Sequence, residues 1–140
     1  MFGSIVVPID LTAPSSWRYA LPKAIELAAP GNGKVAVVAV LPELRLLFES
    51  VEATAELDRV AERARRQLAE IVAAADHGAA DVQQELRSGS ITHEIIGAAK
   101  ARGADLIVMT SRRPEMRDYP IGANAAQVVR HAPCSVLVLR

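Results

Sequence analysis

Short apolar runs rich in β-branched residues alternate along this chain with longer stretches of helical periodicity. The runs at Ser4–Ile9 and Lys34–Leu41 lack the polar alternation of a half-exposed strand, so they are typical of strands buried on both faces. Such strands need a layer of helices on each side of their sheet. The sequence therefore predicts an α/β fold of three layers, with an open parallel sheet of five strands at its centre.

The expected elements follow one another in the order β-α-β-α-β-α-β-α-β. Three further strands are expected at 81–87, 105–110 and 134–139, and the more polar run at 81–87 is expected at an edge of the sheet. The helices are expected at 19–29, 56–75, 91–102 and 122–131. Pro22 either kinks the first of these helices or falls within its first turn.

Composition restricts the kind of protein further. The chain has 140 residues, which suits a single domain over 1–140, and its formal net charge of zero and 4% aromatic content argue against a nucleic-acid partner. No apolar run approaches the roughly 18 residues of a membrane span, and the N-terminus lacks the basic region of a signal peptide. With Cys134 as its one cysteine, the protein is expected to be cytoplasmic, with no disulfide and no membrane partner.

Candidate binding residues follow the expected strands, at the edge where open parallel sheets bind ligands. Asp10 ends the first run, Met109-Thr110-Ser111 ends the fourth, and Gly122-Ala123-Asn124 opens the last helix. A helix start offers free N–H groups and a partial positive charge, so this segment can hold a phosphate, and Arg112-Arg113 can add charge. Each signal also has a purely structural explanation, as a helix cap, a helix-entry glycine or solvated charge.

Standard nucleotide and catalytic motifs do not occur in the sequence. It contains neither G-x-x-x-x-G-K-[ST] nor a G-x-G-x-x-G after the first strand. His77, His93 and His131 fall in different elements without the spacing of metal ligands. Cys134 is expected in a buried strand, where it is more simply a core residue than a nucleophile. The sequence therefore offers no metal site and no conventional catalytic group.

Three segments carry a family resemblance: I-V-V-P-I-D near the start, G-A-D-L-I-V-M-T-S-R-R-P at 103–114, and I-G-A-N-A-A-Q-V-V-R-H-A-P-C-S-V-L-V-L-R at 121–140. Together they resemble the universal stress protein family (UspA domain), over essentially the whole chain. The resemblance implies an adenine nucleotide alpha hydrolase-like sheet in the order 3-2-1-4-5, and a homodimer or tetramer formed through the last strand. It also implies ATP, with or without Mg²⁺, as the ligand of those members that bind nucleotide.

The phosphate motif of ATP-binding members, G-x2-G-x9-G-[ST], is altered in this chain. Thr110 stands at the first glycine, Arg113 at the second, Gly122 falls one position early for the third, and Ala123 replaces the hydroxyl residue. By the strict motif the chain resembles the non-binding members. Yet S-R-R-P and G-A-N-A-A are similar to a subgroup with an S-x-R-P loop and a G-[SA]-N-A-A helix start, some of whose members bind ATP through a differently shaped loop.

The resemblance implies a role for each matching residue. The contacts expected for adenine and ribose are Pro8, Ile9, Asp10, Val40 and Met109. The contacts expected for the phosphates are Ser111, Arg113, Gly122, Ala123 and Asn124, and Thr110 completes the expected binding set. Backbone donors do not need the hydroxyl that Ala123 lacks, so ATP binding is expected to be weakened rather than abolished.

Two hypotheses about function follow. In the first, a stress-response protein binds ATP at the strand ends, and the nucleotide orders the loop 111–121, as a switch or partner module. In the second, nucleotide binding is lost and the protein acts by assembly, through its last strand and the apolar loop 44–48, which otherwise packs on its own core. No strong general base is evident for a γ-phosphate, so at most slow ATP hydrolysis is expected, not a dedicated enzyme.

Overall fold

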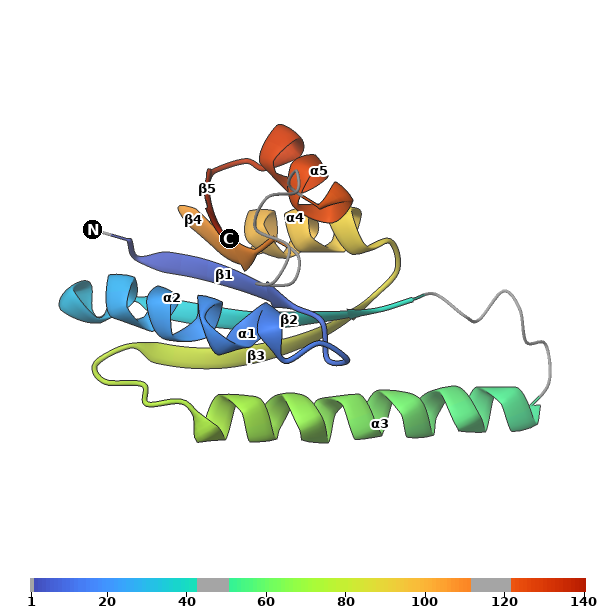
Figure 1. Cartoon of the computed structure of the whole chain (residues 1–140). Helices are drawn as coiled ribbons and strands as arrows, with labels where there is room; N and C mark the ends of the chain where they lie inside the picture. The colour runs from blue at the N-terminus through green and yellow to red at the C-terminus, as the bar shows by residue number, and fades with distance from the viewer. Residues whose placement is uncertain (1, 43–50, 112–121) are drawn as a thin grey trace.

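A five-stranded sheet forms the centre of the computed structural model, which describes residues 2–42, 51–111 and 122–140 (Figure 1). Every pair of neighbouring strands is parallel. In sheet order the strands are β3 (Asp81–Ser88), β2 (Lys34–Leu41), β1 (Ser4–Ile9), β4 (Leu106–Thr110) and β5 (Ser135–Leu139). The predicted α/β class and the strand order 3-2-1-4-5 are confirmed, and the polar strand β3 lies at an edge.

Helices connect these strands. They are α1 (Ser15–Arg18), α2 (Ala20–Ala28) with the 3₁₀ turn η1 (Ala29–Gly31), α3 (Val51–Ala74), α4 (Ile91–Ala101) and α5 (Ala123–His131). Pro22 falls within the first turn of α2, where a missing N–H removes no intrahelical bond, so it does not kink the helix. None of the helices in the described part of the chain combines the length and apolar character needed to cross a membrane.

Alternate residues of the central strands build two separate cores. Val7 of β1 packs with residues of α2 and α3, among them Leu68, whereas its neighbour Val6 packs with residues of α4 and α5, among them Ile95. Figure 1 shows the same division, with α4 and α5 together on the side of the sheet away from α2 and α3. The wholly apolar runs of the sequence are explained by this burial on both faces.

Strands β1 and β4 separate toward their carboxyl ends. Their ladder pairs Ile5 with Leu106 and Val6 with Ile107, and it extends no further among the described residues, although β1 stays paired with β2 as far as Ile9. Pro8 of β1 has no N–H to donate to a neighbouring strand. The order of the strands also reverses between β1 and β4, so the connections that follow these two strands run to opposite faces of the sheet. Open parallel sheets bind ligands at such a point.

A network of charged side chains joins the edge strand β3 to α4. Glu85 pairs with Arg87 at 3.0 Å and with Arg102 at 3.1 Å, and Arg87 also reaches Glu94 at 3.3 Å. Burial acts to raise the pKa of Glu85, but the hydrogen bonds and charges of Arg102 and Arg87 together outweigh it and hold that pKa below its usual range. The network therefore favours the ionised form of Glu85.

Candidate functional site

An apolar cavity of about 290 Å³ lies at the carboxyl ends of β1, β2 and β4, in the opening described above. The strands contribute Pro8, Ile9, Val40, Met109 and Thr110, and α4 contributes Ile91 and Ile95. Asp10, Ser16 and Asn124 supply polar groups at its border, beside Pro42. Apolar walls with a few polar groups are typical of small-molecule and cofactor sites.

A more polar cavity of about 320 Å³ adjoins the first. It is lined by the start of α1, the end of β4 and the start of α5, through Ser15, Ser16, Ser111, Gly122, Ala123 and Asn124. Both cavities are bordered by Asp10, Ser16, Met109, Thr110 and Asn124. The two cavities therefore share a wall and form one crevice, with an apolar end and an end where a helix begins.

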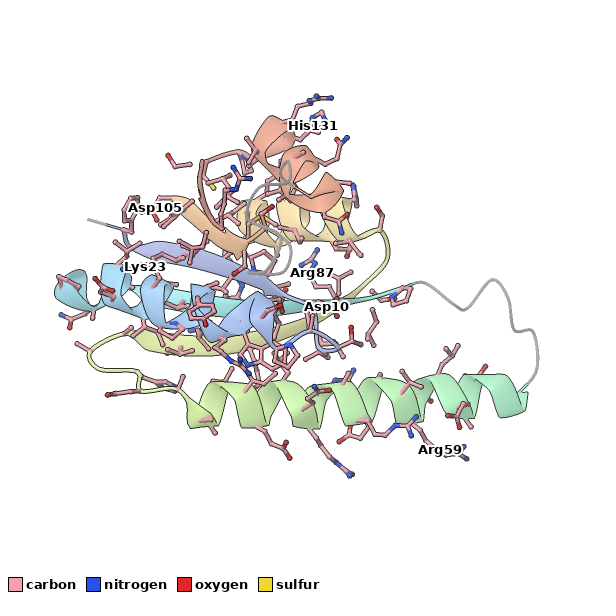
Figure 2. All side chains as sticks on the ribbon, viewed as in Figure 1. Asp10, Lys23, Arg59, Arg87, Asp105 and His131 are labelled. Carbon is pink, nitrogen blue, oxygen red and sulfur yellow. The ribbon has the colours of Figure 1, made fainter. Side chains whose placement is uncertain are left out.

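The loop after β1 is held by its own hydrogen bonds. The backbone N–H and the hydroxyl of Thr12 both donate to Oδ1 of Asp10, at 2.9 and 2.7 Å. Ser16 Oγ accepts from the backbone N–H of Asp10 at 2.9 Å and donates to its carbonyl at 3.1 Å. Asp10 remains exposed at the mouth of the crevice (Figure 2), so its carboxylate both caps the turn and borders the site.

Ser111 connects three elements at the polar end of the crevice. Its backbone N–H donates to the carbonyl of Leu139 in β5 at 2.9 Å, and its hydroxyl accepts from the backbone N–H of Gly122 at 3.0 Å. Ser111 is only 8% exposed. Gly122 is the N-cap of α5, and its own N–H is paired by the bond to Ser111. The orphan donors of the helix start therefore lie at Ala123 and the residues that follow it.

Thr110 ends β4 on the wall that the two cavities share. Its hydroxyl oxygen is buried and has no hydrogen-bond partner within the part of the chain that the structure describes. Buried hydroxyls are normally paired, so an unpaired one at the wall of a crevice is notable. Thr110 is the residue that stands at the first glycine of the altered phosphate motif.

The structure brings the predicted contacts together with one exception. Every predicted site residue except Arg113 borders one or both cavities, whereas Arg112 and Arg113 lie outside the described residues, which leave out residues 43–50 and 112–121. The roles of all the predicted site residues as ligand contacts stay predictions. Sequence reasoning missed seven lining residues: Ala13, Ser15, Ser16, Pro42, Ile91, Ile95 and Ala125. Ser15 and Ser16 were identifiable, because the loop after the first strand of a parallel sheet lies at the ligand-binding edge.

Other parts of the described chain offer less chemistry. A cavity of about 460 Å³ lies between α3 and the ends of β2 and β3, but it contains none of the predicted contacts, and its Arg87 is already paired with two carboxylates. Across residues 2–42, 51–111 and 122–140, no three His, Cys, Asp or Glu side chains are placed to hold a metal ion. Cys134 lies just before β5 and is only partly buried, contrary to its expected place inside a buried strand.

Comparison with known proteins decides the family. The model of the universal stress protein family matches residues 1–140. The chain belongs to the universal stress protein family. Universal stress protein G of Shigella flexneri is 29% identical to it over 143 residues, with 100% of each chain covered.

Solved structures of the same family are similar in fold to this universal stress protein. The universal stress protein UspA of Lactobacillus plantarum has a TM-score of 0.70 at 25% identity, covering 99% of this chain and 97% of that one. A universal stress protein in complex with cAMP has a TM-score of 0.61 at 23% identity, covering 99% and 97%. An Arabidopsis thaliana member with AMP bound has a TM-score of 0.66 at 15% identity, covering 98% and 90%.

Proposed function

We propose that this universal stress protein binds an adenine nucleotide, ATP with or without Mg²⁺, in the crevice between β1 and β4. The observation that carries the proposal is the pair of adjoining cavities, one apolar and one that ends at the start of α5. A nucleotide has the same division, because its base is flat and largely apolar and its phosphates are anionic. The apolar cavity suits the base, and the N–H groups and positive dipole of the helix start suit the phosphates.

Two observations support an adenine nucleotide in particular. The family members of similar fold reported with bound ligands contain cAMP and AMP, which share the adenine nucleoside. The crevice also borders Val40, Ile9 and Met109, the apolar positions at which the family resemblance expects the base. Of the groups expected near the phosphates, Ser111 and Gly122 fix the direction of α5, so that its first free N–H groups border the polar cavity.

The altered phosphate motif is compatible with binding in this proposal. Ala123 lacks a hydroxyl, and one lost hydrogen bond costs about 1 kcal/mol, or roughly fivefold in affinity. Backbone donors at the start of α5 are unaffected by that change. We place the chain with the subgroup that has the S-x-R-P loop and the G-[SA]-N-A-A helix start, although the loop itself lies outside the described residues.

A matched pair of substitutions tests the site by calorimetric titration of ATP and Mg²⁺ into desalted protein. Gly122 has an ordinary φ of −59° at the N-cap of α5, where both Asp and Asn are favoured, so G122D and G122N should both fold. G122D places a carboxylate beside the phosphates, whereas G122N adds the same shape without the charge. We expect ATP affinity to be at least tenfold lower in G122D than in G122N, and equal affinities would contradict the proposed site.

The biological role proposed here is that of a nucleotide-dependent module in a stress response, working as a homodimer or tetramer. Assembly through β5 is supported by its place at the edge of the sheet and by the apolar, partly buried side chains along it. If ATP does not bind, this same edge favours the second hypothesis, in which the protein acts by assembly alone. The switch loop 111–121 and the apolar loop 44–48 of these hypotheses fall almost wholly outside the described residues.

A further inference from the structure

The hydroxyl of Thr110 is the one polar side-chain atom in the described part of the chain that is buried without a hydrogen-bond partner. Thr110 lies at the end of β4 and borders both the apolar and the polar cavity. A hydroxyl that is withdrawn from water and left unpaired makes the free protein less stable than an apolar side chain of the same shape would. A ligand that accepts a hydrogen bond from this hydroxyl would offset that cost.

The other polar groups on the shared wall are already engaged or exposed to solvent. The backbone of Asp10 is bonded to the hydroxyl of Ser16, and its Oδ1 is bonded to Thr12. Asn124 is exposed. Thr110 alone on this wall has a buried group whose hydrogen-bonding capacity is unused. A ligand that spans both cavities must pass this wall between its base and its outer phosphates.

We propose that the Thr110 hydroxyl donates a hydrogen bond to an oxygen of the bound nucleotide at the junction of the sugar and the first phosphate. The inference rests on the proposed function and adds a recognition contact to it. Rotation about the Cα–Cβ bond to another staggered rotamer carries the hydroxyl to a position that the methyl group or the hydrogen held before, so the donor can turn toward the crevice as the ligand enters. Thr110 then replaces, with a side-chain donor, the glycine of the usual phosphate motif.

The test compares T110V with T110S. Valine keeps the shape of threonine and removes the hydroxyl, whereas serine keeps the hydroxyl and removes the methyl group. We expect T110V to bind both AMP and ATP about fivefold more weakly than the wild type, because both ligands contain the sugar–phosphate junction. T110S should stay within about twofold of the wild type. The free T110V protein should melt at the same temperature as the wild type or higher, because it loses an unpaired buried hydroxyl.

Three results would overturn the inference. Wild-type affinity in T110V would show that the ligand does not use the hydroxyl. A lower melting temperature of free T110V would show that the hydroxyl already has a partner without ligand. A loss of affinity for ATP but not for AMP would place the contact at the outer phosphates. If the wild type binds neither nucleotide, the proposed function fails as well, whereas the first three results leave it intact.

Discussion

Single residues at the polar end of the crevice have both a structural and a proposed binding role. Ser111 was expected as a phosphate contact from the family resemblance, but its bond to the N–H of Gly122 could not be predicted. The two residues are separated by a loop, and no local pattern records which groups pair across it. Thr110 shows the same limit, since sequence reasoning placed it at the site but could not show that its hydroxyl is unpaired.

Removal of the Ser111 hydroxyl should loosen the start of α5. S111A leaves the N–H of Gly122 without its partner at 3.0 Å, so we expect the free energy of unfolding to fall by about 1 kcal/mol. Urea denaturation measures this change. Ser135 is exposed at the start of β5, and S135A should change stability by less than about 0.5 kcal/mol. Equal effects of the two substitutions would mean that the Ser111–Gly122 bond does not stabilise the protein.

Secondary-structure elements were predictable where burial dominates the sequence. Four of the strands, β1, β2, β4 and β5, follow from apolar runs, as expected where burial demands apolar side chains, whereas β3 is polar and lies at an edge. The start of α3 was wrong by more than a turn, since the helix begins at Val51 and not near Glu56. Val51 and Thr54 are β-branched and weak helix formers, so the periodic signal rises only later. Ile91 and Ile95 were expected on a helix, but their place in the crevice depends on how α4 packs.

At the edge strand β3, ionised Glu85 should contribute to stability. Its folded-state pKa lies below its usual range, so its contribution is present above the unfolded-state pKa and is lost as the pH falls through the folded-state pKa. E85Q removes the charge that pairs with Arg87 and Arg102. We expect the free energy of unfolding at neutral pH to fall by about 1–2 kcal/mol, and the difference from the wild type to shrink on acidification.

Glu56 on α3 provides the matched control for this prediction. It also pairs with two arginines, Arg59 at 2.8 Å and Arg63 at 3.4 Å. However, the side chain of Glu56 is 56% exposed, and its partner Arg59 lies on the side of α3 that faces away from the sheet (Figure 2). E56Q should therefore change the free energy of unfolding by less than about 0.5 kcal/mol, both at neutral pH and across the acidic range. Urea denaturation across the acidic range distinguishes the two. A constant deficit of E85Q at all pH values would contradict the role given to its charge.

At the scale of the whole molecule, the proposed self-association concerns the edge of the sheet that β5 forms. Five parallel strands leave two edges, and β3 is protected by its charged side chains, whereas β5 presents partly buried apolar residues. Assembly through the last strand, which the family resemblance implies, stays a prediction. Whether a second chain associates with this edge depends on protein concentration and on the surface of the partner, so the oligomeric state cannot be read from one sequence.

A charge on this edge should weaken the assembly. Ser135 is exposed at the start of β5, and S135K places at this edge a lysine whose charge opposes a second strand without removing a side chain from the core. Sedimentation velocity should show a dimer or tetramer for the wild type and at least tenfold weaker association for S135K. Y19K is the control, because Tyr19 is 55% exposed between α1 and α2. A monomeric wild type at high micromolar concentration would contradict assembly through β5.

The central claim is that an adenine nucleotide binds where β1 and β4 separate. Amide NMR spectra of the uniformly ¹⁵N-labelled protein during titration with ATP and Mg²⁺ test it most directly, because they locate binding as well as detect it. The account predicts saturable shifts at Ile9, Thr110, Ser111 and Ala123, and none at Leu57, which lines the larger cavity beside α3. An unchanged spectrum at millimolar ATP, or shifts confined to the cavity beside α3, would contradict it.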